Sequence, residues 1–217
     1  MRKEYTRSLD KLRENLMEMG HRVDETMLNT MEALQKHDVE LAQQIMDGDE
    51  QINAMGYALE QNCMYLITRQ QPIARDLRVI TSTLKAVTDI ERIGDQCADI
   101  SEIITRREST WAAKDLPYSK IIQMFEEAHK MYVRAIDSLM ASDEEVANAV
   151  RAQDDVVDTM FHNIVLEISS IMAQKPVLAS EAVDDIIMVK YIERIGDHAT
   201  NIAEWTVYLV TGTHPGF

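Results

Sequence analysis

The sequence predicts an all-α protein made of two tandem, antiparallel three-helix bundles. Aromatic residues make up 6% of the chain and apolar residues 46%, with 14 Met, a composition that is poor in strand formers. Apolar residues recur at steps of three and four, and no convincing period-two run interrupts them. The hexapeptide IERIGD occurs twice, at 90–95 and at 192–197, which indicates an internal repeat.

Proline positions and apolar periodicity divide the chain into six helices. A proline in a helix interior costs ~3 kcal/mol, so Pro72, Pro117 and Pro176 are expected to lie outside helices. The predicted helices span residues 4–36, 38–70, 74–108, 118–141, 143–174 and 178–211. Asp38 and the pair Ser142-Asp143 are the expected N-caps, because short polar side chains there can accept backbone N–H groups.

The two halves of the chain align with each other beyond the hexapeptide. ELAQQIMDGDEQIN at 40–53 matches EVANAVRAQDDVVD at 145–158, and each half has a proline turn before its third helix. The chain is therefore predicted to be a duplicated three-helix unit, with one domain at 1–110 and the other at 111–217. The segment 109–119 is the expected connection.

Composition excludes several classes of function. The chain has 22 basic and 37 acidic residues, a formal charge of -15, so it should repel nucleic acids. The only adjacent basic pairs are Arg2-Lys3 and Arg106-Arg107, which indicates no basic patch. Two cysteines, Cys63 and Cys97, do not form a disulfide framework and are expected to be free and buried. No signal peptide or apolar stretch of about 20 residues is apparent, which favours a soluble cytoplasmic protein.

The hexapeptide carries an acidic stripe that is unfavourable for an isolated helix. Glu91, Asp95 and Asp99 are spaced by four residues and share one helix face. Each like-charged pair destabilises a helix by ~0.2–0.5 kcal/mol, and Gly94 in the helix interior adds about 1 kcal/mol. The second copy repeats the pattern, with Asn201 in place of Asp99. A cation held between the carboxylates would remove the repulsion.

A second set of polar residues on the preceding helix faces this stripe in the first repeat. In an antiparallel hairpin, residues equidistant from the turn lie at the same height. Asp49 with Asp95, and Asn53 with Glu91, are both centred on Pro72. The sequence therefore predicts that the two pairs face each other.

The second repeat shows the same relation. Asp154 with Asp197, and Asp158 with Glu193, are centred beside Pro176. Oxygen-rich sites without thiols favour hard cations such as magnesium, manganese, calcium or carboxylate-bridged iron, whereas zinc usually requires His or Cys. The predicted ligands are Asp49, Asn53, Glu91, Asp95, Asp154, Asp158, Glu193 and Asp197.

The acidic and histidine residues also allow interpretations other than a metal site. A solvated acidic face is the simplest alternative in a chain this acidic. Glu18-x-x-His21 and Glu126-x-x-His129 are similar to the motifs of ferritin-like di-iron sites, but His21 is expected to face water and His129 to be a core histidine. His198 could be an outer ligand. Arg92 and Arg194, which follow the glutamates, are interpreted as charge balance.

The chain resembles the PhoU family of phosphate-transport regulators over essentially its whole length. The resemblance rests on the two Glu-x-x-x-Asp copies in DIERIGD and YIERIGD, the QPIARDLR turn and the duplicated three-helix unit. It implies two three-helix bundles, often in a homodimer, with metal clusters at the motif pairs; iron, manganese and magnesium are the candidate ions. Asn53 and Asn201 depart from an acid, so the two sites are not expected to bind metal equally.

In function, the resemblance implies negative control of phosphate uptake and of the phosphate-starvation response. Such proteins relay the state of the high-affinity phosphate transporter, through its ATPase subunit, to a membrane sensor histidine kinase, and they are not enzymes. Two alternatives remain: a carboxylate-bridged metal-dependent enzyme or metal-storage bundle, and a structural helical protein with an acidic face. The sequence contains no Gly-rich phosphate loop, nucleophile elbow or Ser-His-Asp set.

Overall fold

The computed structural model describes residues 2–107 and 116–215, with side chains described from Tyr5 onward. Its elements are α1 (Arg2–Lys36), α2 (Val39–Gln70), α3 (Arg75–Arg106), α4 (Tyr118–Ala141), α5 (Glu144–Gln174), η1 (Pro176–Leu178) and α6 (Ala179–Thr211). The six predicted helices are confirmed, and no strand occurs in the described ranges. The 3-10 turn η1 was not predicted. The predicted connection at 109–119 lies largely outside the described residues.

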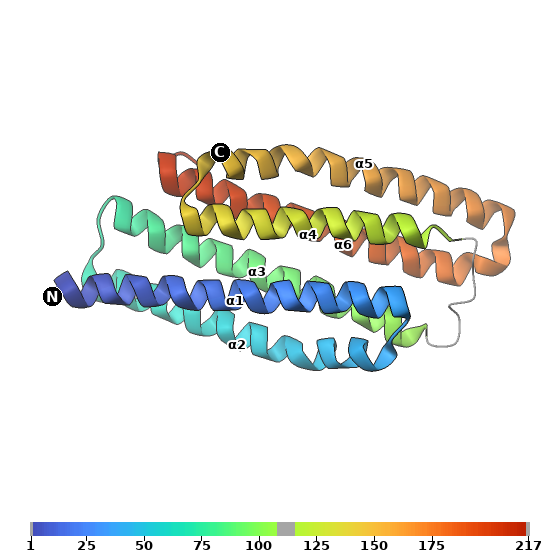
Figure 1. Ribbon diagram of the computed structural model, residues 1–217, viewed down its shortest axis with the longest axis horizontal. Coiled ribbons are helices and arrows are strands. Elements are labelled where there is room, and N and C mark those ends of the chain that lie inside the picture. The colour runs from blue at the N-terminus through green and yellow to red at the C-terminus, as the bar shows by residue number, and fades with distance from the viewer. Residues whose placement is uncertain (1, 108–115, 216–217) are drawn as a thin grey trace.

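The helices form two three-helix bundles that lie side by side (Figure 1). In the first bundle α1, α2 and α3 all contact one another, and in the second α4, α5 and α6 do the same. The bundles meet mainly through α3 against α6, with a smaller contact of α1 against α4. This arrangement confirms the predicted fold class and places the hexapeptide helices, α3 and α6, at the centre of the molecule.

Short polar side chains cap two of the helices, largely as expected. An Asp38 carboxylate oxygen accepts the Leu41 N–H at 2.9 Å, and one of Asp143 accepts the Val146 N–H at 3.1 Å. Ser142 does not cap α5. It adopts the left-handed conformation, with φ 53°, and ends α4 instead, so of the predicted Ser142-Asp143 pair Asp143 alone is the N-cap.

The predicted apolar faces form the core. Met19, Val23 and Met27 of α1 are fully buried, and so is Phe125 of α4. Burying a side chain of this size contributes ~1.5–3 kcal/mol, so periodic burial, rather than helix propensity, stabilises these long helices. Tyr132 is also buried, and its hydroxyl donates to the Gly20 carbonyl oxygen at 2.8 Å, which ties α4 to α1.

A buried ion pair joins the two bundles where α3 ends. The Arg107 guanidinium donates to the Asp185 carboxylate and to the Tyr118 hydroxyl, and both members of the ion pair are almost completely buried. Burial raises the pKa of Asp185 to about 6, and Arg107 opposes that rise. The residues come from α6, α4 and the end of α3, so this cluster fixes the relative position of both repeats.

Helix α5 is more apolar than the sequence analysis indicated. By length and composition it meets the criterion for a membrane span, and only 17% of its most apolar window is buried. It nevertheless packs along α4 and α6, and it carries Asp154 and Asp158. We therefore describe it as a bundle helix whose outer face exposes apolar side chains such as Val156 and Leu166.

Candidate metal centres

Gly94 allows α2 and α3 to approach closely in the first repeat. A methyl group at this position would lie 3.2 Å from Ile52 Cδ1 and 3.7 Å from Asp49 Oδ1. Contacts of 3.2 Å are tighter than ordinary van der Waals packing, so a larger residue would push the helices apart. The hexapeptide glycine therefore allows the two helices to approach closely, and Asp49 lies beside it, at the height that the hairpin alignment predicts.

The first acidic site contains oxygen atoms without hydrogen-bond donors. The Asn53 amide donates to Asp49 Oδ2 at 2.9 Å, but Asp49 Oδ1 and Asn53 Oδ1 are buried without a partner. Burial raises the pKa of Asp49, and the nearby Asp95 raises it further. Burial and Asp95 also raise the pKa of Glu91. Orphaned buried oxygens cost ~1–3 kcal/mol each, and a hard cation would satisfy both, so these residues fit a metal.

In the second repeat Gly196 likewise allows two helices, α5 and α6, to approach closely. A methyl group on Gly196 would lie 3.3 Å from Val157 Cγ1 and 3.7 Å from Asp154 Oδ1. These contacts correspond to those of Gly94 in the first repeat. The glycine in both copies of IERIGD is thus explained by close packing against the preceding helix, which carries the facing acids.

In the second repeat three carboxylates gather into a potential ligand set. Oxygens of Asp158, Glu193 and Asp197 all lie within 4.8 Å of one another, and no other group of three or more His, Cys, Asp or Glu among the described residues comes this close. Burial raises the pKa of Asp197, and the charges of Glu193 and Asp154 add to the rise. Burial likewise raises the pKa of Asp154. Carboxylates that repel each other in this way are suited to a multivalent cation.

Basic side chains border both sites. Arg92 pairs with Asp95 at 3.0 Å, and Lys190 pairs with Glu193. The first contact agrees with the interpretation of Arg92 as charge balance. Lys190 was not identified from the sequence, although it lies one helical turn before Glu193, the spacing at which side chains on a helix meet.

Several neighbouring polar residues belong to the contact between α3 and α6. Asp89 accepts a hydrogen bond from the Asn201 amide at 3.0 Å and lies 2.9 Å from His198 Nδ1. His198 is therefore held by the opposite repeat. Burial raises the pKa of Asp99, the charge of Asp95 adds to the rise, and Arg194 of α6 opposes it. Asp89 was missed from the sequence because its partners lie more than one hundred positions away.

The two Glu-x-x-His motifs do not form a ferritin-like site. His21 is exposed on α1. His129 of α4 is part-buried, and its Nε2 lies 2.6 Å from Asp24 Oδ1. The expected exposure of His21 is confirmed. His129 has the expected partner but lies at the edge of the core and not inside it, where it links α4 to α1.

Fold and site together define a class: an all-α protein of two fused three-helix repeats, each with acidic side chains on its second and third helices beside a close-packed glycine. The family described as PhoU domain matches the chain at residues 16–104 and 121–206, once in each repeat. The chain belongs to the PhoU family, which confirms the resemblance drawn from the sequence.

Curated relatives match the chain over nearly its full length. One from Burkholderia sp. is 34% identical, with 97% of this chain and 90% of the relative covered. One from Clostridium acetobutylicum is 34% identical, and the match covers 97% of this chain and 96% of the relative. Both are named phosphate-specific transport system accessory protein PhoU homolog.

Solved structures of the family have the same fold. The crystal structure of PhoU from Pseudomonas aeruginosa superposes with a TM-score of 0.93 at 32% identity, covering 96% of this chain and 100% of that one. The crystal structure of the phosphate transport system regulatory protein PhoU from Streptococcus pneumoniae superposes with a TM-score of 0.88 at 25% identity. That superposition covers 97% of this chain and 98% of the other chain. Both repeats of this chain are therefore present in these relatives.

Proposed function

We propose that this protein is a regulatory accessory of a phosphate-specific transport system that restrains phosphate uptake and the phosphate-starvation response. The observation that carries the proposal is the match of both repeats, over almost the whole chain, to relatives named phosphate-specific transport system accessory proteins. The role is a relay: the protein reads the state of the transporter through its ATPase subunit and passes it to a sensor histidine kinase. It acts in the cytoplasm and performs no catalysis.

A gene deletion tests the regulatory role. Cells without the protein should take up phosphate and express a starvation reporter at high external phosphate, and the wild-type gene should restore repression. Unchanged uptake and reporter activity in the deletion strain would refute the proposal. Pull-down from membranes, with the wild-type chain as bait, tests the transporter ATPase and kinase as partners, and light scattering of the purified protein tests the proposed homodimer.

The acidic clusters are proposed to bind hard multivalent cations such as iron, manganese or magnesium. The ligands would be Asp49, Asn53, Glu91 and Asp95 in one repeat and Asp154, Asp158, Glu193 and Asp197 in the other. A bound cation would neutralise the carboxylates and hold the second and third helices of each repeat together. A cation with this role, unlike one in a metal-dependent enzyme, requires no open coordination position.

The second-repeat site is proposed to bind more tightly. Its proposed ligand set has four carboxylates, of which Asp158, Glu193 and Asp197 already gather in the structure. The first set has three carboxylates and the neutral Asn53, and four negative ligands attract a divalent cation more strongly. Calorimetric titration of Asp95→Ala and Asp197→Ala with manganese tests the order, and Asp197→Ala should remove the stronger event. Asp155→Asn, an exposed acid on the same helix as Asp158, is the matched control. Loss of the weaker event in Asp197→Ala would contradict the charge-count argument.

A further inference from the structure

A pair of adjoining cavities lies where the two repeats meet at one end of the molecule. This end holds the N-terminus of the chain, the turn before α3, the turn after α4 and the end of α6 (Figure 1). The outer cavity, about 340 Å³, is lined by Arg75, Arg78, Ser142, Leu209 and Val210. The inner cavity, about 210 Å³, shares three of these residues. The rest of its lining is mainly aliphatic, with Asp10, Arg13 and Thr83 as the polar exceptions.

The outer cavity carries positive charge, and no acidic side chain lines it. Some arginines of this chain pair with carboxylates, as Arg107 does with Asp185, and others donate to neutral oxygens, as Arg134 does to Gln153. Here Arg78 donates from Nε to the Leu209 carbonyl oxygen at 3.3 Å, a neutral acceptor. Arg75 is exposed and makes no hydrogen bond or ion pair with any described residue. Two guanidinium groups therefore line one cavity, and neither pairs with a carboxylate among the described residues.

The backbone adds donors at the same place. Arg75 is the first residue of α3, and no side chain caps that helix. The first N–H groups of a helix lack partners within the helix, and its positive dipole end favours anions. Of these groups the Asp76 N–H is bonded to the Ile73 carbonyl oxygen, and the Asp76 carboxylate lies in the same first turn. Ser142 contributes a hydroxyl to the cavity wall from the turn after α4. Donors from both repeats therefore surround one space that no acidic side chain lines.

We propose that this cavity binds a phosphoryl-type oxyanion, held by Arg75, Arg78 and the Ser142 hydroxyl. Guanidinium groups match the oxygen spacing of such anions and form charge-assisted hydrogen bonds with them. The ligand would contact α3 of the first repeat, the turn after α4 and the end of α6, so its binding would be coupled to the arrangement of the repeats. The inner cavity would accept an apolar group attached to the phosphoryl group.

The proposal goes beyond the regulatory function, because a protein without this site could still restrain uptake. Titration calorimetry of the full chain tests it, after chelation to keep metal-bound phosphate out of the measurement. The probes are inorganic phosphate and phenyl phosphate, with chloride as the ionic-strength control. Tighter binding of phenyl phosphate would identify an organic phosphate as the ligand, and equal binding would identify the free ion.

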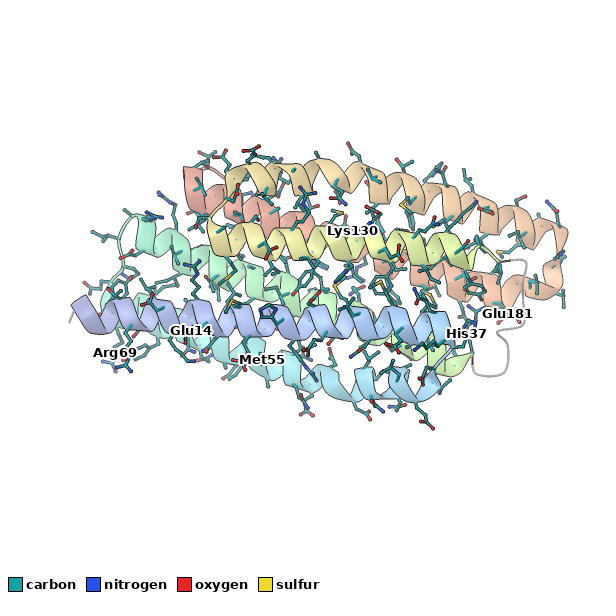
Figure 2. The ribbon with its side chains drawn as sticks, viewed as in Figure 1. Glu14, His37, Met55, Arg69, Lys130 and Glu181 are labelled. Carbon is teal, nitrogen blue, oxygen red and sulfur yellow. The ribbon has the colours of Figure 1, made fainter. Side chains whose placement is uncertain are left out.

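Two variants distinguish phosphate binding in this cavity from non-specific attraction of the anion to positive charge. Arg75→Gln should weaken phosphate binding about tenfold or more, because it removes a charge-assisted donor. Arg69→Gln is the matched control: Arg69 is exposed at the same end of the molecule but outside the cavity (Figure 2), and its loss should leave binding unchanged. No saturable binding of either probe to the wild-type chain, or equal losses in both variants, would overturn the proposal.

Discussion

Replacing Gly196 by alanine should destabilise the protein, although alanine favours a helix interior over glycine by about 1 kcal/mol. The added methyl group would lie 3.3 Å from Val157 Cγ1 and 3.7 Å from Asp154 Oδ1. Val157 is fully buried, and a β-branched side chain in a helix has one strongly preferred rotamer, so it cannot turn aside. Overpacking of this kind costs ~1–3 kcal/mol, which leaves a net loss of about 1 kcal/mol.

Gly48→Ala is the matched control for this prediction. Gly48 is also inside a helix, but the nearest atom to an added methyl group is the end of the Arg22 side chain at 3.6 Å, an ordinary contact. The control should gain about 1 kcal/mol, a rise in Tm of about 2–4 °C for a chain of this size. Gly196→Ala should show a fall of similar size.

Thermal unfolding followed by far-UV circular dichroism, with chelator present, measures both variants. If Gly196→Ala is stabilised as much as Gly48→Ala, the close-packing explanation of the hexapeptide glycine is wrong. A double variant sharpens the test, because Val157→Ala provides space for the new methyl group. The two substitutions should therefore be coupled favourably, by about 1 kcal/mol relative to the sum of their separate effects.

Three further predictions concern the capping, the ion pair and the thiols. Asp143→Ala should lower the free energy of unfolding by about 1 kcal/mol in denaturant titration, because it removes the α5 N-cap. Arg107→Met should lower the free energy of unfolding by ~3–5 kcal/mol at pH 7 and by less at pH 4. Removing Arg107 raises the pKa of Asp185 in the folded protein above its present value of about 6. Because that carboxyl group then prefers to stay protonated in the folded state, the variant loses stability as the pH rises. A loss that is independent of pH would contradict the assigned pairing. Cys63 and Cys97 should not react with a thiol reagent at pH 8 in the folded protein, because burial raises the pKa of each thiol to about 12. Both should react after unfolding. Fast labelling of the native protein would refute this prediction.

Much of the fold could be predicted because it follows from local patterns. Steps of three and four apolar residues located the helices, and the repeated hexapeptide together with the proline turns located the two bundles. The hairpin alignment also placed Asp49 opposite Asp95 and Asp154 opposite Asp197, because an antiparallel hairpin fixes heights from positions alone. The structure places Asp49 and Asp154 beside the hexapeptide glycines.

Contacts between the repeats could not be predicted in this way. Nothing in the local sequence indicates that α3 packs against α6, so the pairing of Asp89 with His198 could not be predicted. The same holds for Arg107, which the sequence marked only as part of an adjacent basic pair. The sequence also indicated no basic patch, yet Arg75 and Arg78 form the lining of one cavity with residues of the other repeat. Alignment of one half on the other compares equivalent residues, not residues in contact.

The covalent joining of the two repeats has a consequence for how the protein behaves in a cell. Two separate three-helix units would associate through α3 and α6 only above a concentration set by their affinity. Within one chain each unit meets its partner at a fixed, high effective concentration, so the paired state does not depend on how many copies are made. A regulator built in this way can be present at a few copies or at many without a change in its internal architecture. Its two halves are also free to diverge in sequence, and they have done so at Asn53 and Asn201.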